Sequence, residues 1–570
     1  TSSQRATARF ASAVRELAAE DAERIEDRLG AFGAYGKRGD DDDDNEDLKL
    51  MSELFLLGAR YRVSDSHEIN KDAGEIRVDE SVILKTLKEM HGYLPRESRR
   101  ALDAIYGRGE TSAAVEEDRG ERIFASQRIG YALLLNEAQS RAVRLYAADV
   151  NAYPRVFCIL SPPGSGKTTV AAAMAAEAAR GNAHRMYQPQ LLLSVQNVAV
   201  DNMGAALKKM DYGGGTIYNM KTTKKLDPHC PAPFDFLDLM DEETLEQWKT
   251  HQISLERKVC VNRDEVEQRK KKGVTIDLEY EMKNMSYEEC LTCDRRSFEN
   301  QLRPKIILST VEMMLQKMYT NSKLCDVIRE VRRVIIDEVS LLTEAALYAV
   351  IRRFPNARIV LIGDDNQFPP FMYDCKILGQ ELAGRPALSV AMKAEKVPVV
   401  ELKEVYRAPQ SLVEPYNRLP YGGRLVSKKA EGESPLSAIG LVHSGLPQLL
   451  LIDVDGRQER NEKTMSLYNE KEIKALQRLL SKFPEEWKDE IMIICLYKEQ
   501  KRRLQSAIDK DFRVLTVDSS QVKEKPIVIL MTTRTEIPKA GTFFDSIERC
   551  NVSVSRQQKA LIILGKANLL

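Results

Sequence analysis

The sequence predicts an α/β fold in which helices cover parallel sheets, with two such domains in tandem. From about residue 131 onward, short apolar runs rich in β-formers alternate with helical patterns. A glycine-rich turn at 161–169 separates the apolar run 156–160 from the alanine-rich run 170–179. Strands that alternate with helices in this way are typical of parallel sheets with helices on both faces.

Composition bounds the class of protein. The chain has 570 residues, 43% hydrophobic and 30% charged, which suits a globular protein of roughly three or four domains. Lys plus Arg and Asp plus Glu both number 85, so no global charge points to nucleic acid, membrane or an acidic substrate. No run of about 18 apolar residues occurs and residues 1–10 are polar. We therefore expect an intracellular protein of the cytoplasm or nucleus, with no membrane partner.

Changes in the pattern of apolar and charged segments divide the chain into three parts. Residues 1–130 are predicted to form an N-terminal accessory region, which is also the expected site for a protein partner. Its acidic run at 40–47 is typical of a solvated linker, and an interaction tail is the alternative. Residues 131–390 are predicted as the first α/β domain, with a charged insertion at about 204–303. Residues 391–570 are predicted as the second α/β domain.

Each predicted strand is a short apolar run between polar or helical segments. In the first domain the strands are 156–160, 191–195, 306–308, 334–336 and 358–362. In the second domain they are 399–402, 449–454, 491–496, 514–517, 527–530 and 561–564.

The turn at 161–169 is predicted to bind nucleotide phosphates, and a chance glycine turn is the alternative. A strand, such a turn and a helix in succession place backbone N–H groups and a helix N-terminus around the β- and γ-phosphates. The side chain of Lys167 would supply a positive charge, and the Thr168 hydroxyl would ligate Mg²⁺. The expected cofactors are ATP or GTP, with Mg²⁺. The predicted nucleotide contacts are Gly164, Ser165, Gly166, Lys167, Thr168 and Thr169.

Polar side chains follow two later strands. After 334–336, Asp337 would hold Mg²⁺ through water, and Glu338 would orient and deprotonate an attacking water. Ligands of α/β sheets bind at the carboxyl ends of strands, although such a pair also opens many ordinary loops. At 361–370, Gln367 is a predicted contact for the γ-phosphate, and a plain Gly-Asp turn is the alternative.

The nine cysteines do not form a disulfide framework. Cys290 and Cys293 have metal-like spacing, with His229, Cys230 and Cys260 as remote partners. Zinc is a minor alternative, because no second closely spaced pair completes the pattern.

The order of these motifs resembles the superfamily 1B helicases, specifically the up-frameshift-like group. The resemblance extends over about 135–566 and rests on eight segments in the family's order. These segments are 135–139, 161–169, 194–202, 309–310, 404–407, 415–425, 516–524 and 549–556.

The resemblance implies two tandem RecA-like P-loop NTPase domains, with ATP hydrolysed in the cleft between them. It implies that Gln139 recognises the adenine and that Glu524 accepts hydrogen bonds from the ribose. It also implies that Arg407 and Arg556 reach the γ-phosphate, where a guanidinium stabilises transition-state charge.

The resemblance further implies a single-stranded nucleic acid as partner, with RNA favoured over DNA. Family members contact the backbone, so the binding would not depend on sequence. The implied contacts are Ser194, Asn197, Ser309, Thr310 and Thr516. A basic stretch in the insertion either neutralises phosphates or forms a solvated face, namely Lys221, Lys224, Lys225 and 269–272.

We therefore expect an ATP hydrolase (helicase) that moves 5′ to 3′ on single strands, the polarity coming from the resemblance. The chain departs from the family motifs at Ser161, Val339, Leu341, Ser520, Val522 and Gln557. Val522 replaces a glycine that allows positive φ or close backbone approach, so coupling of hydrolysis to movement could be weakened. The alternatives are an ATP-gated nucleic-acid clamp or ribonucleoprotein scaffold with weak or no unwinding, and a P-loop signalling or metabolic NTPase.

Overall fold

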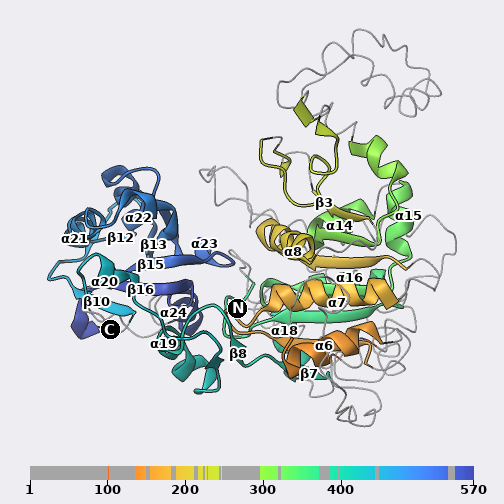
Figure 1. Cartoon of the computed structure of the whole chain (residues 1–570), viewed down its shortest axis with the longest axis horizontal. Helices are drawn as coiled ribbons and strands as arrows, with labels where there is room; N and C mark the ends of the chain where they lie inside the picture. Colours follow the sequence, from red (N-terminus) through yellow and green to blue (C-terminus); the bar gives the residue numbers. More distant parts are fainter. Residues whose placement is uncertain are drawn as a thin grey trace, which may run out of the picture. The chain divides into compact units, whose positions relative to one another are not determined.

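The computed structural model describes part of the chain (Figure 1). The described residues are 101, 105, 135–148, 154–181, 188–210, 216–221, 225–227, 229–242, 245–246, 295–318, 322–370, 385–393, 397–442, 448–536 and 546–569. The predicted acidic linker, the basic run 269–272, Lys224, Cys260, Cys290 and Cys293 lie outside these residues.

The chain splits into two compact units. The first comprises the residues up to Ile159, Thr168–Gly363 and Pro369–Val400. The second comprises Leu160–Lys167, Asp364–Phe368 and Glu401–Leu570, so the turn predicted to bind phosphates clusters with it.

The first unit contains a seven-stranded sheet in the order β3-β4-β2-β5-β6-β1-β7. Its strands are β1 (Val156–Leu160), β2 (Gln190–Ser194), β3 (Ile217–Met220), β4 (Ile306–Thr310), β5 (Arg333–Asp337), β6 (Arg358–Gly363) and β7 (Val399–Glu401). The pairs from β3 to β6 are parallel. The strands β2, β3, β5 and β6 are buried at every residue, as expected where both faces of a parallel sheet are covered.

The helices of this unit follow the strands in the alternation that the sequence predicts. They are α6 (Glu137–Ala147), α7 (Lys167–Gly181), α8 (Asn197–Lys209), α14 (Val311–Lys317), α15 (Lys323–Arg329), α16 (Glu344–Arg353) and α18 (Ala387–Lys393), with the 3-10 turn η4 (Val339–Leu341) after β5. No helix among the described residues combines the length and hydropathy needed to cross a bilayer.

Two buried arginines anchor the C-terminal end of α6. Arg333, at the start of β5, donates to the carbonyls of Tyr146 at 3.2 Å and Ala148 at 3.0 Å. Arg358, at the start of β6, donates to the carbonyls of Leu145 at 2.6 Å and Ala148 at 3.0 Å. The last carbonyls of a helix lack partners within the helix, and a cation complements the negative end of its dipole. The helix α6 is therefore tied to the sheet through two strands.

The second unit contains a five-stranded sheet in the order β10-β16-β15-β13-β14, and all its pairs are parallel. Its strands are β10 (Leu449–Asp453), β13 (Ile491–Cys495), β14 (Arg513–Thr516), β15 (Lys525–Met531) and β16 (Gln557–Gly565). Two smaller sheets pair β8 (Glu404–Val405) with β9 (Val426–Ser427), and β11 (Glu459–Arg460) with β12 (Leu467–Tyr468).

The helices of the second unit cover this sheet around a continuous apolar core that includes Leu476, Ile493, Ile529 and Ile562. They are α19 (Gln410–Tyr421), α20 (Pro435–Ala438), α21 (Glu470–Leu480), α22 (Lys498–Ala507), α23 (Val517–Ser520) and α24 (Ile547–Ser553), with the 3-10 turns η5 (Glu485–Glu490) and η7 (Ala567–Leu569).

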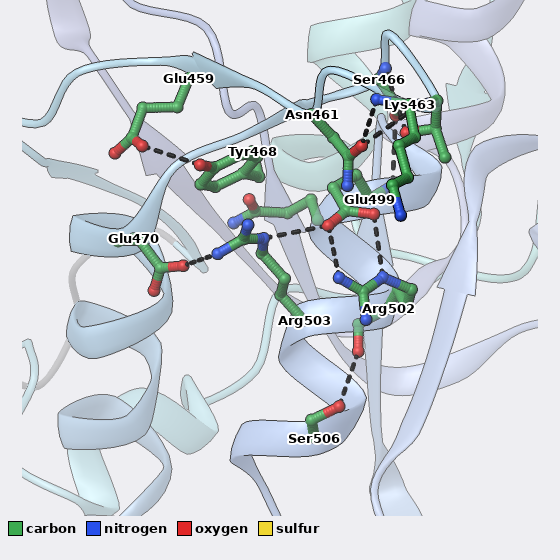
Figure 2. Close-up of polar contacts among 12 residues, drawn as sticks. Glu459, Asn461, Lys463, Ser466, Tyr468, Glu470, Glu499, Arg502, Arg503 and Ser506 are labelled. Carbon is green, nitrogen blue, oxygen red and sulfur yellow. Dashed lines mark hydrogen bonds and ion pairs between the residues drawn. The ribbon is translucent and has the colours of Figure 1, made fainter.

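A polar cluster holds the β11–β12 hairpin against α21 and α22 (Figure 2). The carboxylate of Glu499, only 2% exposed, accepts hydrogen bonds from Arg502 and Arg503. Donation from Arg502 lowers the pKa of Glu499 to about 2 despite burial. The Arg503 guanidinium lies 3.5 Å from the ring centre of Tyr468 on β12 and pairs with Glu470 on α21. One arginine thus joins hairpin and helices.

Two segments differ from the sequence prediction. Residues 399–402 were expected to open the second domain, but β7 joins the edge of the first sheet, where the carbonyl of Pro398 accepts from Cys158 N at 2.9 Å. Within the predicted insertion, β3 pairs with β4, so the chain returns to the first sheet inside that range. Apolar patterns report that a strand is buried, but not which sheet it joins.

A buried carboxyl supports the end of β15. Glu472, in the first turn of α21, is fully buried, and its Oε2 accepts a hydrogen bond from Thr533 N at 3.0 Å. Burial raises the pKa of Glu472 to about 8, which the single hydrogen bond from Thr533 does not offset. Thr533 has φ of 68°, where a β-branched residue is strained. This carboxyl therefore stays protonated at neutral pH while it holds a strained turn.

The substitution Glu472→Gln is expected to remove a pH dependence of stability. The unfolded side chain ionises near its ordinary value of 4.5, and the folded one only near 8. The stabilisation that this group gives is therefore present below pH 4.5 and is lost as pH rises through 8. Thermal unfolding at pH 6 and pH 8 should show E472Q losing less stability than the wild type, by up to a few kcal/mol. The control is Glu470→Gln in the same turn, and an equal loss in E472Q and wild type would contradict the assignment.

Candidate functional site

The turn between β1 and α7 has the backbone of a phosphate-binding loop. Gly164 and Gly166 adopt φ of 77° and 85°, a region that favours glycine. Ser165 Oγ donates to the carbonyl of Pro162 at 2.8 Å and accepts from Ser161 Oγ at 2.8 Å. Ser161, which stands where the family has glycine, is fully buried and does not have positive φ. Its hydroxyl therefore strengthens the loop, and no glycine is required there.

The loop packs against the segment that carries Arg407, and both belong to the second unit. The carbonyl of Gly164 accepts from Tyr406 N at 2.8 Å. A Cβ added to Gly164 would lie 2.6 Å from Arg407 Cβ and 3.2 Å from Val405 Cγ1. Glycine is therefore needed at 164 both for its φ and for this close approach.

Three predicted site residues lie in one row at the carboxyl ends of β4, β2 and β5. Ser194 is in register with Thr310 on one side and with Asp337 on the other. Asp337 is 1% exposed, and the buried hydroxyl of Ser194 has no hydrogen-bond partner among the described residues. A buried carboxylate beside an unpaired hydroxyl is an oxygen-rich environment that suits Mg²⁺. Thr168, the other predicted ligand, lies in the first turn of α7.

Glu338 follows this row in an unusual conformation. Its φ and ψ are 54° and 39°, in the left-handed region, and its N–H donates to Asp337 Oδ1 at 2.8 Å. Strained backbone in a buried carboxylate residue is frequent at functional sites. The family departure Val339 is accommodated nearby, since its Cγ1 would lie 2.8 Å from a Cβ at Gly363 and glycine leaves that space open.

The predicted ribose and γ-phosphate contacts meet in the second unit. Arg407 donates to Glu524 at 2.5 Å and to the carbonyl of Ser555 at 2.6 Å. Burial raises the pKa of the Glu524 carboxyl, but Arg407, Gln558 and Arg556 together outweigh burial and the net pKa is lowered. Arg556 is buried and donates to the carbonyl of Val552 at 3.1 Å. The two arginines are therefore held on adjoining backbone.

Both predicted glutamines are held by neighbours. Gln139 and Asn136 form a capping box at the start of α6, in which Gln139 Oε1 accepts from Asn136 N at 3.1 Å. Gln367 is buried, and its Nε2 donates to Asp364 Oδ2 at 2.9 Å. The position of each carboxamide is thus set by the protein itself.

The implied nucleic-acid contacts lie at strand ends or helix starts. Ser309 and Thr310 end β4, and the hydroxyl of Thr310 accepts from Met313 N at 3.2 Å. Asn197 is the exposed first residue of α8. Thr516 ends β14 and caps α23, where its hydroxyl contacts Ser519 Oγ at 2.9 Å.

The prediction for Lys221 was wrong. Its ammonium is buried and forms an ion pair with Asp201 at 2.8 Å, so it neither contacts phosphate nor belongs to a solvated face. Asn219 also donates to Asp201, at 3.1 Å. A lysine in a basic stretch reveals nothing of a partner 20 residues upstream, which is why the sequence missed this pair.

The structure also reveals two residues whose roles were not predicted from the sequence. Asp364 and Tyr421 lie inside recognised motifs, yet their hydrogen bond at 2.6 Å joins positions far apart in the chain. A polar residue within an apolar helix pattern, as Tyr421 is in α19, is the one signal that could have indicated a buried hydrogen bond.

Comparisons with known proteins match most of the chain. Two family models, each described as an AAA domain, match residues 134–374 and 384–568. The mouse 5'-3' DNA helicase ZGRF1 is 34% identical over 257 residues, covering 42% of this chain and 13% of that protein. Helicase sen1 of Schizosaccharomyces pombe is 24% identical over 508 residues, covering 76% and 29%. Regulator of nonsense transcripts 1 of Dictyostelium discoideum is 26% identical over 229 residues, covering 37% and 17%.

The phosphate loop and the carboxylates after β5 define the class as that of the P-loop NTPases. The family matches and the relatives then narrow the class: the chain belongs to the superfamily 1B helicases, in their up-frameshift-like group. The predicted family and the α/β fold class are confirmed, and the predicted ATP hydrolase (helicase) activity stays a proposal for this chain. The chain spans less than a third of the length of these three relatives.

Gly164→Ala is expected to abolish tight ATP binding. The added Cβ would clash with Arg407. Alanine would also have to adopt φ of 77°, which alone costs about 1–2 kcal/mol. We expect at least about a tenfold loss of affinity, since 1.4 kcal/mol is tenfold in binding. A fluorescent ATP analogue titrated into the protein measures this.

The matched control is Gly422→Ala. Gly422 also has positive φ, 59°, but nothing lies within 4 Å of its added Cβ. G422A should keep wild-type affinity for the ATP analogue. Equal losses of affinity in G164A and G422A would show that backbone strain, and not the contact with Arg407, causes the effect.

Proposed function

We propose that this chain is an ATP-dependent translocase and helicase that moves 5′ to 3′ on single-stranded RNA, with DNA as the second candidate polymer. The observation that carries the proposal is the packing of the glycine loop against the segment of Arg407, so close that no Cβ fits at Gly164 and its carbonyl accepts from Tyr406 N. A loop for phosphates beside an arginine is the arrangement that phosphoryl transfer requires.

Each predicted residue then has a role in hydrolysis. Lys167 and the loop N–H groups bind the phosphates, and Thr168 and Asp337 would hold Mg²⁺, which neutralises charge on the phosphate oxygens when bound. Glu338 accepts a proton from the attacking water, whose oxygen forms a bond to the γ-phosphorus as the bond to the β-phosphate oxygen breaks. Gln367, Arg407 and Arg556 stabilise charge on the transferred group, while Gln139 and Glu524 contact adenine and ribose.

Support for polarity and polymer comes from the relatives. The mouse relative is named a 5'-3' DNA helicase, which supports the polarity and supports DNA as the second candidate polymer. The Dictyostelium relative is named for nonsense transcripts, which favours RNA. The side chains of Asn197, Thr310 and Thr516 reach the surface and suit contacts to a backbone, which carry no sequence information. Ser194 and Ser309 are buried, so their contacts would need the strand ends to open.

Location and protein partners remain proposals from composition. The proposed location is the cytoplasm or the nucleus. We also infer that a protein partner binds residues 1–130, the accessory region.

ATP hydrolysis should be stimulated by single-stranded RNA or DNA, and Lys167→Ala and Glu338→Gln should each lose about 100-fold or more of the rate. E338Q keeps the shape of Glu338 but cannot accept the proton, so it should still bind ATP. Phosphate release with each polymer measures this, and duplexes with 5′ or 3′ overhangs test the polarity. A hydrolysis rate that neither polymer changes would contradict the proposal that the chain is a nucleic-acid translocase.

A clamp with weak unwinding is the second candidate function, and the backbone of Val522 favours it. Val522 stands where the family has glycine and adopts φ of 67°. A β-branched residue in the left-handed region costs about 1–2 kcal/mol. This strain lies in the motif 516–524, between Thr516 and Glu524, and could impede movement between conformations.

If the strain limits coupling, Val522→Gly should unwind more base pairs per ATP hydrolysed. Strand displacement and phosphate release measured on the same sample give this ratio. Met465→Gly is the matched control, because Met465 also has positive φ, 57°, but is 58% exposed and lies outside the motif. An unchanged ratio in V522G would eliminate Val522 as a reason to favour the clamp.

A further inference from the structure

A chain of buried hydrogen bonds links three motifs within the second unit. The carboxylate of Asp364 accepts from Tyr421 Oη at 2.6 Å and from Gln367 Nε2 at 2.9 Å through the same oxygen. Its other oxygen accepts from Asn366 N at 3.1 Å. Asp364, Gln367 and Tyr421 are each less than 5% exposed, so water does not compete for these bonds.

The network continues into α24. Asn551 Nδ2 donates to Tyr421 Oη at 2.7 Å and to the carbonyl of Asn366 at 2.8 Å. Arg556 is held to the same helix, through its bond to the carbonyl of Val552. Asn551 and Arg556 are therefore both attached to one element, α24. Figure 1 labels α24 and α19, the helix that carries Tyr421.

The direction of each hydrogen bond follows from the chemistry. Burial raises the pKa of Asp364 to about 6, so the group is a carboxylate at neutral pH and can only accept. Burial, and after it the negative charge of Asp364, raises the pKa of Tyr421 far above its ordinary value. The proton of Tyr421 therefore stays on the phenol oxygen. Asn551 thus donates to Tyr421, and Tyr421 donates to Asp364. Only a hydroxyl can accept from one and donate to the other at this position.

The carboxamide of Gln367 is oriented by the same carboxylate. Because Asp364 accepts only, the nitrogen of Gln367 must face it, and one of its N–H groups is committed there. The plane of the carboxamide then depends on the position of Asp364, which depends in turn on the hydroxyl of Tyr421. A short bond to a charged oxygen is the strong kind of hydrogen bond.

We propose that Tyr421 is a positioning residue for ATP hydrolysis, whose hydroxyl fixes Gln367 through Asp364 and fixes both relative to helix α24 and Arg556 through Asn551. The proposal rests on the proposed function, because Gln367 and Arg556 are the groups assigned there to the γ-phosphate. Tyr421 touches no reacting atom. It acts by keeping two phosphate contacts in one arrangement.

The chain offers a matched control on the same helix. Tyr416 is 1% exposed, and its ring lies 6.3 Å from that of Tyr421 at 80°. Its hydroxyl has no hydrogen-bond partner among the described residues. Tyr416→Phe therefore removes the same atom from the same core without breaking a hydrogen bond.

The experiment measures kcat and KM for ATP, with saturating single-stranded RNA or DNA, for the wild type, Tyr421→Phe and Tyr416→Phe. We expect kcat of Y421F to fall about tenfold or more, because a hydrogen bond to a charged group is lost from the organised site. We expect KM to change less than about twofold, because no group that binds ATP is removed, and Y416F to match the wild type. A purely structural role would lower the melting temperature while kcat and KM stay as in Y416F.

Asp364→Asn provides the same test if Y421F does not fold. Asparagine has one acceptor oxygen where aspartate has two, so it cannot accept from Tyr421 and Gln367 at one atom and from Asn366 N at the other. We therefore expect kcat to fall with KM held. Wild-type kcat in a folded Y421F or D364N, or equal losses in Y421F and Y416F, would overturn the proposal while the proposed function stands. A wild type with no polynucleotide-stimulated hydrolysis would overturn both.

Discussion

The parallel register of the first sheet is the constraint on which the candidate site depends. In a parallel sheet every strand delivers its carboxyl end to the same edge, so residues far apart in sequence become neighbours. Ser194, Thr310 and Asp337 form one row for this reason, although 143 positions separate the first from the last. The second sheet follows the same rule, since Thr516 is in register with Cys495 at the ends of β14 and β13. Hydrogen-bonded backbone, and not side-chain attraction, assembles these rows.

Buried polar groups then fix loops and helices to the sheets. Each is satisfied differently: Lys221 by an opposite charge, Arg358 by helix carbonyls, and Asp364 by neutral donors. Glu472 has one hydrogen bond and is kept neutral by burial. Such groups are expensive to bury and specify geometry through the bonds they require. They occur where a loop or helix must keep one position relative to a strand end.

The sequence predicted most strands of both sheets, because they are short continuous apolar runs. It missed β3, which lies within the predicted insertion. It did not predict the two-residue strands β8, β9, β11 and β12, which hold no run long enough to show a period. It placed 399–402 in the wrong sheet, because hydrophobicity does not encode the pairing partner. The contacts of Lys221 and Tyr421 were also missed, because each is made with a residue distant in the chain.

The site residues also divide into those that local motifs predict and those whose contacts join distant parts of the chain. The loop glycines, Asp337 and Glu338 could be found because their motifs are local and follow strands. A positive φ at Val522 could be predicted from the glycine that it replaces, and the structure gives Val522 φ of 67°. The pairing of Arg407 with Glu524 could not be foreseen, since two motifs of known order carry no information on which side chains face each other.

The capture of α6 by Arg333 and Arg358 has a consequence for how this part of the fold opens. Helix ends normally fray independently of the sheet beneath them, and their amides exchange with solvent early. Here the last carbonyls of α6 are bonded to side chains that start two central strands. Its C-terminal turn can open only if those guanidinium groups are released, which links its exchange to that of β5 and β6. Early fraying is then left to the opposite end of the helix, where the capping box joins only Asn136 and Gln139 of the first turn.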